Sequence, residues 1–146
     1  MATISNCNLP EELYYLVEKH VWARYDDGIV NVGLTDVAQN MAKGIISVSP
    51  KKVGRMVDAG KSVATVESSK WVGPVPSPVK GEILEVNAAV VADPSIINRD
   101  PYGEGWIARL RPEDWATESS GLATGEAGIA AYAAFLAAEG ITCTEP

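Results

Sequence analysis

The chain is 146 residues long, carries a formal net charge of −7 and is 47% hydrophobic. Its length predicts one domain with a substantial core, and its acidic balance excludes general nucleic-acid binding. No apolar run approaches the ~18 residues of a membrane span, and residues 1–6 lack the basic and apolar regions of a secretory signal, so we expect a cytoplasmic protein.

A short helix and a hairpin are the first predicted elements. Pro10 is favoured at the first position of a helix, and apolar residues follow at three- and four-residue spacing up to Val17. Residues 21–25 and 29–34 then alternate on either side of Asp26-Asp27-Gly28. Because Gly adopts positive φ at little cost, this second segment predicts a β-hairpin with a tight turn.

His20 stands directly before this hairpin and is the only histidine of the sequence. A histidine can take part in acid–base chemistry because its pKa lies near neutrality. No nucleophile or paired acid accompanies it in the sequence, however. We therefore favour a structural role for His20, with acid–base chemistry as the alternative.

The remaining elements predict a mainly β fold. Thr35 suits the N-cap of a helix over residues 36–43, and Gly44 suits its C′ position. Short segments that are separated from one another by glycine- and proline-containing turns predict strands over residues 45–48, 62–67, 83–86 and 106–110. Such strands favour an all-β sandwich or barrel with short helices. Residues 119–125 predict a linker, and the alanine-rich residues 126–139 predict a C-terminal helix that docks through one apolar face.

The hairpin predicted over residues 63–83 has a polar tip that carries Lys70. A single surface lysine is usually only a solvated charge, but at a hairpin tip its amine can reach a cavity of another protein. Pro74, Pro76 and Pro78 stiffen the return strand and remove amide donors from a sheet edge. No catalytic constellation accompanies the tip. We therefore expect a non-enzymatic protein.

Five motifs surround this tip: His20-Val21-Trp22, Gly33-Leu34-Thr35-Asp36-Val37-Ala38-Gln39, Glu67-Ser68-Ser69-Lys70, Ser77-Pro78-Val79-Lys80-Gly81-Glu82-Ile83-Leu84-Glu85-Val86-Asn87 and Asn98-Arg99-Asp100-Pro101-Tyr102-Gly103-Glu104-Gly105-Trp106-Ile107. In this part of the chain, roughly residues 18–115, the sequence resembles the H protein of the glycine cleavage system. The resemblance implies a mainly β barrel-sandwich hybrid of the lipoyl/biotinyl type, with lipoate in amide linkage to Lys70. Biotin carriers share this architecture, but their lysine typically lies between two methionines. Here Ser69 and Trp71 flank it, which favours lipoate.

The same resemblance implies how the chain is organised. We expect an N-terminal helical segment over residues 1–19, a lipoyl-carrier domain over residues 20–115, and a linker with a C-terminal helix over residues 116–146, all in one folding unit. Glu67 lies three residues before Lys70; it either guides the attachment enzyme or is a solvated acid. The implied partners are a lipoate ligase or another lipoate-attachment enzyme, and the enzymes that load and unload the arm.

Departures from the H-protein pattern flank the tip in the sequence. The loop that contains Lys51, Lys52 and Arg55 is basic, whereas H proteins usually have an acidic loop here. Trp71 occupies a position at which H proteins usually have a small residue. Because surface charge selects partners, we expect these four residues to lie beside the arm and to dock partners other than those of glycine cleavage.

This sequence is similar to lipoate-binding proteins that serve a heterodisulfide-reductase-like complex in sulfur oxidation. We favour this role for the protein. In that role the arm carries sulfur intermediates. One alternative is an H protein of the glycine cleavage system, whose arm carries an aminomethyl group. Another is an unmodified H-like module that only binds a partner.

Cys7 and Cys143 lie near opposite ends of the chain. They are too few for a disulfide scaffold and lack the spacing of metal ligands, so we expect no metal site. Because the ends of a domain often lie close in space, they are a candidate redox pair that could exchange with the thiols of an arm. We favour the alternative of two unrelated thiols at frayed chain ends.

Overall fold

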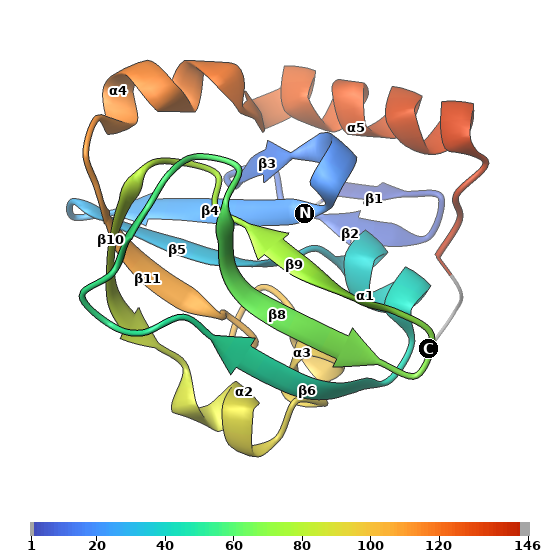
Figure 1. The fold of residues 1–146 in the computed structure, drawn as a ribbon. Helices are drawn as coiled ribbons and strands as arrows, with labels where there is room; N and C mark the ends of the chain where they lie inside the picture. Colours follow the sequence, from blue (N-terminus) through green and yellow to red (C-terminus); the bar gives the residue numbers. More distant parts are fainter. Residues whose placement is uncertain (1, 144–146) are drawn as a thin grey trace.

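The computed structural model describes residues 2–143 and contains three antiparallel sheets in that range (Figure 1). The largest sheet has, in spatial order, the strands β12 (Ala123–Thr124), β3 (Tyr14–Leu16), β4 (Val21–Asp26), β5 (Ile29–Leu34), β11 (Ala108–Pro112), β10 (Gly81–Val86) and β7 (Met56–Val57). The second sheet has the order β6 (Ile45–Pro50), β8 (Ser62–Ser68) and β9 (Val72–Pro76). A separate hairpin joins β1 (Ala2–Ile4) to β2 (Cys7–Leu9).

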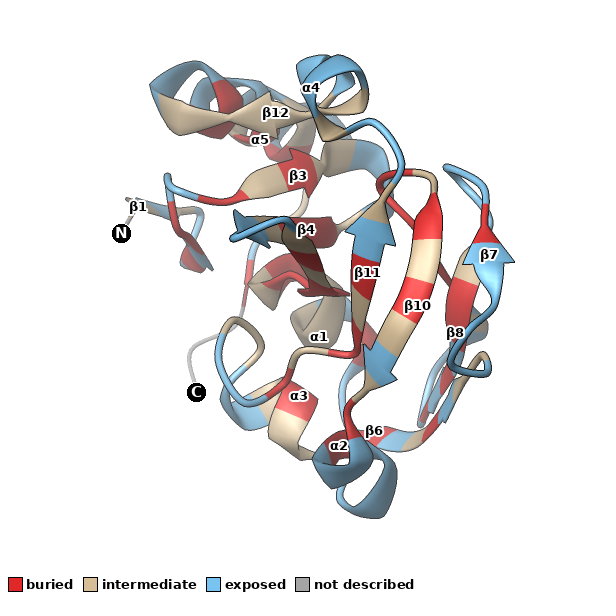
Figure 2. Ribbon diagram, turned by 90° about the vertical axis from the view of Figure 1, so that its left-hand side faces the viewer, coloured by how far each residue is buried: buried red, intermediate tan, exposed pale blue. Residues whose placement is uncertain are grey.

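The main hydrophobic core lies between the seven-stranded and the three-stranded sheets. It contains Val30 from β5 and Ile83 from β10 together with Val66 from β8, and all three are fully buried. Burial alternates along β10 and β11, because successive side chains of a strand point to opposite faces (Figure 2). The predicted mainly β fold with a C-terminal helix is therefore confirmed.

Short helices cover the two ends of the sheets. The α-helices are α1 (Asp36–Ala42), α2 (Ala88–Ala92), α3 (Ile96–Arg99), α4 (Trp115–Glu118) and α5 (Gly125–Glu139), and the 3₁₀ turns are η1 (Val17–Lys19) and η2 (Ser119–Gly121). In Figure 1, α4 and α5 run along the top of the molecule, and α2 and α3 lie at the bottom. Within residues 2–143, none of these helices combines the length and apolar character needed to cross a membrane.

The first predicted hairpin and the helix after it form as expected. Asp27 and Gly28 both have positive φ in the turn between β4 and β5, with values of 52° and 79°. The Thr35 side chain accepts a hydrogen bond from an amide in the first turn of α1. The end of α1 differs, because Lys43 rather than Gly44 has the positive φ, 64°.

Residues 10–17 do not form the predicted helix. The chain turns after Pro10, and β3 pairs with β4 so that Tyr14 lies opposite Ala23. The side chain of Tyr15 is then fully enclosed. The prediction of a helical segment over residues 1–19 is wrong because sheet pairing and burial of an aromatic side chain override a weak local helix preference.

The predicted linker over residues 119–125 is also largely ordered. It contains η2 and β12, and Ala123 of β12 lies opposite Tyr15 of β3. The C-terminal helix then forms as predicted, and Gly140 ends it with a φ of 66°. It packs through Ile129, Tyr132 and Leu136 onto a second apolar cluster, separate from the main core. Residues 144–146 of the predicted C-terminal segment lie outside the described residues.

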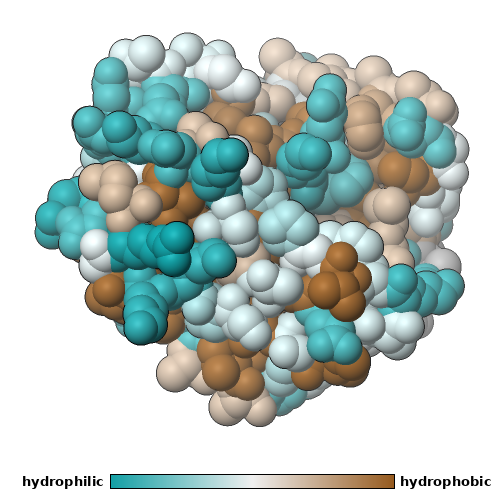
Figure 3. All heavy atoms as spheres, in the orientation of Figure 1, coloured by the Kyte–Doolittle hydropathy of each residue, from teal (hydrophilic) through white to brown (hydrophobic). Residues whose placement is uncertain are grey.

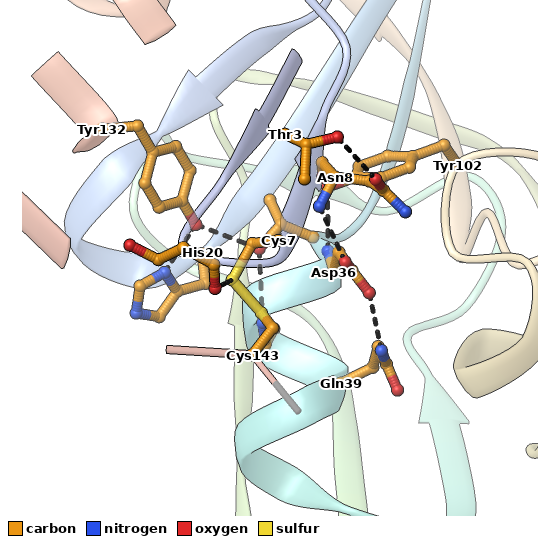
Figure 4. Close-up of a disulfide and its surroundings, with 12 residues drawn as sticks. Thr3, Cys7, Asn8, His20, Asp36, Gln39, Tyr102, Tyr132 and Cys143 are labelled. Carbon is orange, nitrogen blue, oxygen red and sulfur yellow. Dashed lines mark hydrogen bonds between the residues drawn. A yellow bond between two sulfur atoms is a disulfide. The ribbon is translucent and has the colours of Figure 1, made fainter. Parts of the chain in front are cut away.

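Cys7 and Cys143 form a disulfide in this second cluster (Figure 4). Their Cα atoms are 5.2 Å apart, and both residues are almost fully buried. The bond ties the β1–β2 hairpin to the segment after α5, where the Cys143 amide donates to the Ser5 carbonyl. The favoured alternative of two unrelated thiols at frayed chain ends is therefore wrong. A redox role for the pair stays a prediction, and burial requires local opening before any exchange.

Replacement Cys143→Ser should lower the free energy of unfolding by about 2–4 kcal/mol, because the disulfide closes a long loop in the unfolded chain. Urea unfolding of the oxidised wild type and the variant measures this difference. Wild type treated with a strong thiol reductant is the matched control and should unfold at the same urea concentration as the variant. Equal midpoints for the oxidised wild type and the variant would show that the bond adds no stability.

Candidate functional site

The turn between β8 and β9 is organised by the side chain of Ser68. The Ser68 amide donates to the Trp71 carbonyl over 2.7 Å, which closes the turn. The Ser68 hydroxyl oxygen then accepts hydrogen bonds from the amides of Lys70, at 3.2 Å, and Trp71, at 3.0 Å. Ser68 itself is only 6% exposed. One buried hydroxyl therefore fixes the backbone on which Lys70 stands.

Lys70 is exposed at this turn, and its amine has no ion pair or hydrogen bond with any residue between 2 and 143. The neighbouring Ser69 amide donates to the Gly44 carbonyl at 3.1 Å, which joins the turn to the segment after α1. The lysine therefore combines a hydrogen-bonded backbone with an exposed amine that no described residue engages. An amide linkage to a carboxylic acid requires such an amine, so Lys70 fits the lipoyl group that the sequence implies.

The residues on either side of Lys70 are also accessible. Glu67 points to the outer face of β8 because burial alternates along this strand. Trp71 is 42% exposed, and its ring lies over Gly73, where a Cβ atom would come within 2.8 Å of the Trp71 Cε2 atom. Gly73 thus provides the space that lets a large aromatic side chain lie beside the lysine.

A cleft of about 520 Å³ opens beside the turn and includes Lys70 and Trp71 in its lining. Pro74 and Pro76 of β9 also line it, and α1 contributes Met41. Its polar lining residues other than Lys70 are Glu18, Lys19 and His20, at the end of η1. Figure 3 shows the face of the molecule that carries β8, β9 and α1, where hydrophobic and polar side chains are interspersed. A flexible, largely apolar arm on Lys70 would find an apolar surface next to its attachment point.

His20 links this cleft to the C-terminal helix. Its Nδ1 atom lies 2.5 Å from the Tyr132 hydroxyl of α5 (Figure 4). That hydroxyl lies 3.0 Å from the Thr35 hydroxyl. Burial lowers the pKa of His20 to about 4, so the imidazole is neutral at pH 7. The predicted structural role agrees with these contacts, but His20 is also a lining residue of the cleft.

Lys51, Lys52 and Arg55 lie at the other end of the sheet from Lys70. The Lys51 amide donates to the Val63 carbonyl at the start of β8, whereas Lys70 follows the end of that strand. Seven residues of extended chain span roughly 20 Å, and Figure 1 shows the loop after β6 and the β8–β9 turn at opposite sides. The expectation that these basic residues lie beside the arm is wrong, because the length of β8 separates them from Lys70. The basic loop lies at the start of this strand, and Lys70 follows its end.

Several residues of this site were missed in the sequence. The role of Ser68 could have been predicted from the sequence, because a serine hydroxyl at a hairpin tip often accepts hydrogen bonds from the amides that follow it. The roles of Tyr132 and Met41 could not have been predicted in this way, because both residues follow the ordinary apolar pattern of a helix face. For metals, no group of three potential ligands from histidine, cysteine, aspartate and glutamate occurs in the part of the chain that the structure describes.

Replacement Ser68→Ala should lower the free energy of unfolding by about 1–2 kcal/mol, because the amides of Lys70 and Trp71 lose their acceptor. Ser69→Ala is the matched control: Ser69 is exposed and is anchored through its amide, so its stability should change by less than about 0.5 kcal/mol. Chemical unfolding of both variants measures the difference. Equal stabilities would contradict the role given to the Ser68 hydroxyl.

Comparisons with known proteins agree with this site. The family model for the glycine cleavage H-protein matches residues 13–135. Glycine cleavage system H protein 5 of Aquifex aeolicus is 52% identical over 116 residues, which cover 77% of this chain and 78% of the relative. Probable glycine cleavage system H protein 2 of Saccharolobus solfataricus is 47% identical over 147 residues, covering 98% of each.

A crystal structure of a glycine cleavage system H protein from Mycobacterium marinum has the same fold. It is 36% identical and superposes with a TM-score of 0.69, covering 77% of this chain and 97% of that one. The predicted barrel-sandwich architecture is therefore confirmed. H proteins are non-catalytic carriers that hold lipoate covalently on a lysine, and this chain belongs to the glycine cleavage H-protein family.

Proposed function

We propose that Lys70 is the lipoyl attachment site and that the arm moves a bound group between enzyme partners. This proposal is supported by the exposed amine of Lys70, which has no partner among residues 2–143, on a turn that the Ser68 hydroxyl holds in place. An attachment enzyme must place one amine next to an activated carboxylate, and a fixed backbone lowers the entropic cost of doing so. Glu67, exposed three residues earlier, is available for recognition by that enzyme.

The cleft supports a second property of a carrier. Amide formation removes the positive charge of Lys70, which leaves Glu18 and Lys19 as the charged lining residues. The apolar wall that Met41 and Trp71 provide is suited to a hydrocarbon chain. We propose that the arm lies in this cleft between encounters, where the protein partly shields the bound group from water, and leaves it when a partner docks.

Glycine cleavage is the pathway that the family and the names of the relatives support best. In this role the arm carries an aminomethyl group and its partners are the glycine cleavage enzymes. The exposed side chains of Met41, Trp71 and Val72 near the turn provide apolar area for such docking. Lys51, Lys52 and Arg55 remain a proposed docking surface, but one that a partner would reach away from the arm.

Transport of sulfur intermediates for a heterodisulfide-reductase-like complex is the second candidate. One observation favours it: among the described residues, 2–143, no buried carboxylate lines the cleft, and the acid that does line it, Glu18, is exposed. An aminomethyl group is a cation at neutral pH and would gain most from a buried acid. Lys19 and a neutral His20 suit a cargo that accepts hydrogen bonds or carries negative charge.

Incubation with a lipoate ligase, lipoate and ATP should add a single lipoyl mass to the wild type and none to Lys70→Arg. Intact mass spectrometry measures this change. The matched control Lys43→Arg replaces another exposed lysine close to the turn and should be modified like the wild type. An unmodified wild type would favour the alternative of a module that only binds a partner, and a modified Lys70→Arg variant would place the arm on another lysine.

The cargo can be tested on the lipoylated protein. With glycine and a glycine decarboxylase from a glycine cleavage system, its intact mass should rise by the aminomethyl group. The H protein from Mycobacterium marinum serves as the positive control under the same conditions. If that control is loaded and this protein is not, glycine cleavage is excluded and the sulfur role becomes the leading candidate.

A further inference from the structure

His20 has an unusual backbone conformation for a residue other than glycine. It caps η1 with a φ of 57° and a ψ of 45°, in the left-handed region. Residues held in this region cost free energy and persist where surrounding contacts fix them. Here the His20 carbonyl accepts a hydrogen bond from the Thr35 amide at 3.0 Å, and the ring stacks on Tyr132 with an angle of 23° between the planes. These contacts hold the imidazole at the wall of the cleft.

The hydrogen-bond chain from α1 through α5 fixes which ring nitrogen carries the proton. The Thr35 hydroxyl oxygen accepts a hydrogen bond from the Ala38 amide, and its own proton needs an acceptor because Thr35 is fully buried. The Tyr132 oxygen is that acceptor. Tyr132 then donates its proton to Nδ1 of His20. Burial raises the pKa of Tyr132, which keeps the hydroxyl protonated, so the proton of the neutral imidazole is on Nε2.

Nε2 is therefore a hydrogen-bond donor without an assigned acceptor. Nε2 has no hydrogen-bond partner among residues 2–143. Every buried side-chain nitrogen or oxygen atom in that range does have a hydrogen-bond partner, so Nε2 is not buried and is accessible. His20 is a lining residue of the cleft that also includes Lys70. The charged residues that line the same cleft as His20 are Glu18 and Lys19 of η1 and Lys70 of the turn, and the His20 ring contacts Tyr132 of α5.

We propose that the Nε2–H group of His20 donates a hydrogen bond to a sulfur atom of the lipoyl arm in the cleft and stabilises the thiolate form of the reduced arm. This inference rests on the proposed attachment of lipoate to Lys70. The thiol gives its proton to water, and no oxidation is involved. A hydrogen bond to the charged form of an acid favours that form, and the thiolate is the nucleophilic form of a thiol. His20 would thus be a cofactor-binding residue that raises the reactivity of the arm.

Alkylation of the reduced, lipoylated protein tests this role. At pH 7 the faster of the two arm thiols should react with iodoacetamide about three- to tenfold faster in the wild type than in His20→Phe, which keeps an aromatic ring without nitrogen. His20→Gln retains an N–H donor near the position of Nε2 and should recover part of the rate. Lys19→Gln, the control for general positive charge, should stay closer to the wild type than to His20→Phe. All rates should converge near pH 11, where the thiols are ionised.

Nitrogen-15 NMR of the single histidine gives an independent readout. The unmodified wild type should show the Nε2–H tautomer, Tyr132→Phe should lose this preference, and lipoylation followed by reduction should shift the Nε2 signal. Identical pH profiles of alkylation for wild type and His20→Phe, with an unchanged Nε2 signal, would overturn the inference while leaving the carrier function intact. Failure of the wild type to accept lipoate, seen by intact mass before alkylation, would overturn the proposed attachment and this inference together.

Discussion

The carrier end of this molecule depends on the hydrogen bonds of one buried serine. Ser68 closes the β8–β9 turn through its main chain and holds the amides of Lys70 and Trp71 through its hydroxyl. The two strands that meet at the turn are anchored by Val66 and Val75, which are fully buried in the main core. Hydrogen bonds to Ser68 therefore hold the backbone at Lys70, while the Lys70 side chain is exposed. This division suits a carrier, whose arm must move while its base stays recognisable.

A second set of contacts connects the C-terminal helix to the same site. Tyr132 of α5 reaches the hydroxyl of Thr35 and the ring of His20, which lines the cleft beside Lys70. The Cys7–Cys143 disulfide lies in the apolar cluster under this helix. Residues far apart in the sequence thus shape the wall on which the arm would lie, and α5 contributes to the site without contributing a catalytic group.

Local chemistry made part of this structure predictable. The Asp27-Gly28 turn, the Thr35 cap and the Gly140 helix end follow from backbone preferences of single residues, and Lys70 follows from its motif. The N-terminal strand at Tyr15 was missed because its burial depends on β4 and α5, which no local pattern reports. Placing Lys51 beside the arm failed for the same reason, since strand pairing carries that loop to the far end of β8. Long-range pairing, rather than propensity, decided both.

Backbone dynamics at the turn report directly whether Ser68 holds Lys70 in place. Nitrogen-15 relaxation of the unmodified protein gives an order parameter for each amide, and rigid backbone has values of about 0.85. We expect values near this level for Ser68, Lys70 and Trp71, similar to those in the middle of β8. Values below about 0.6 at Lys70, typical of a flexible loop, would contradict a base that the serine hydroxyl holds in place.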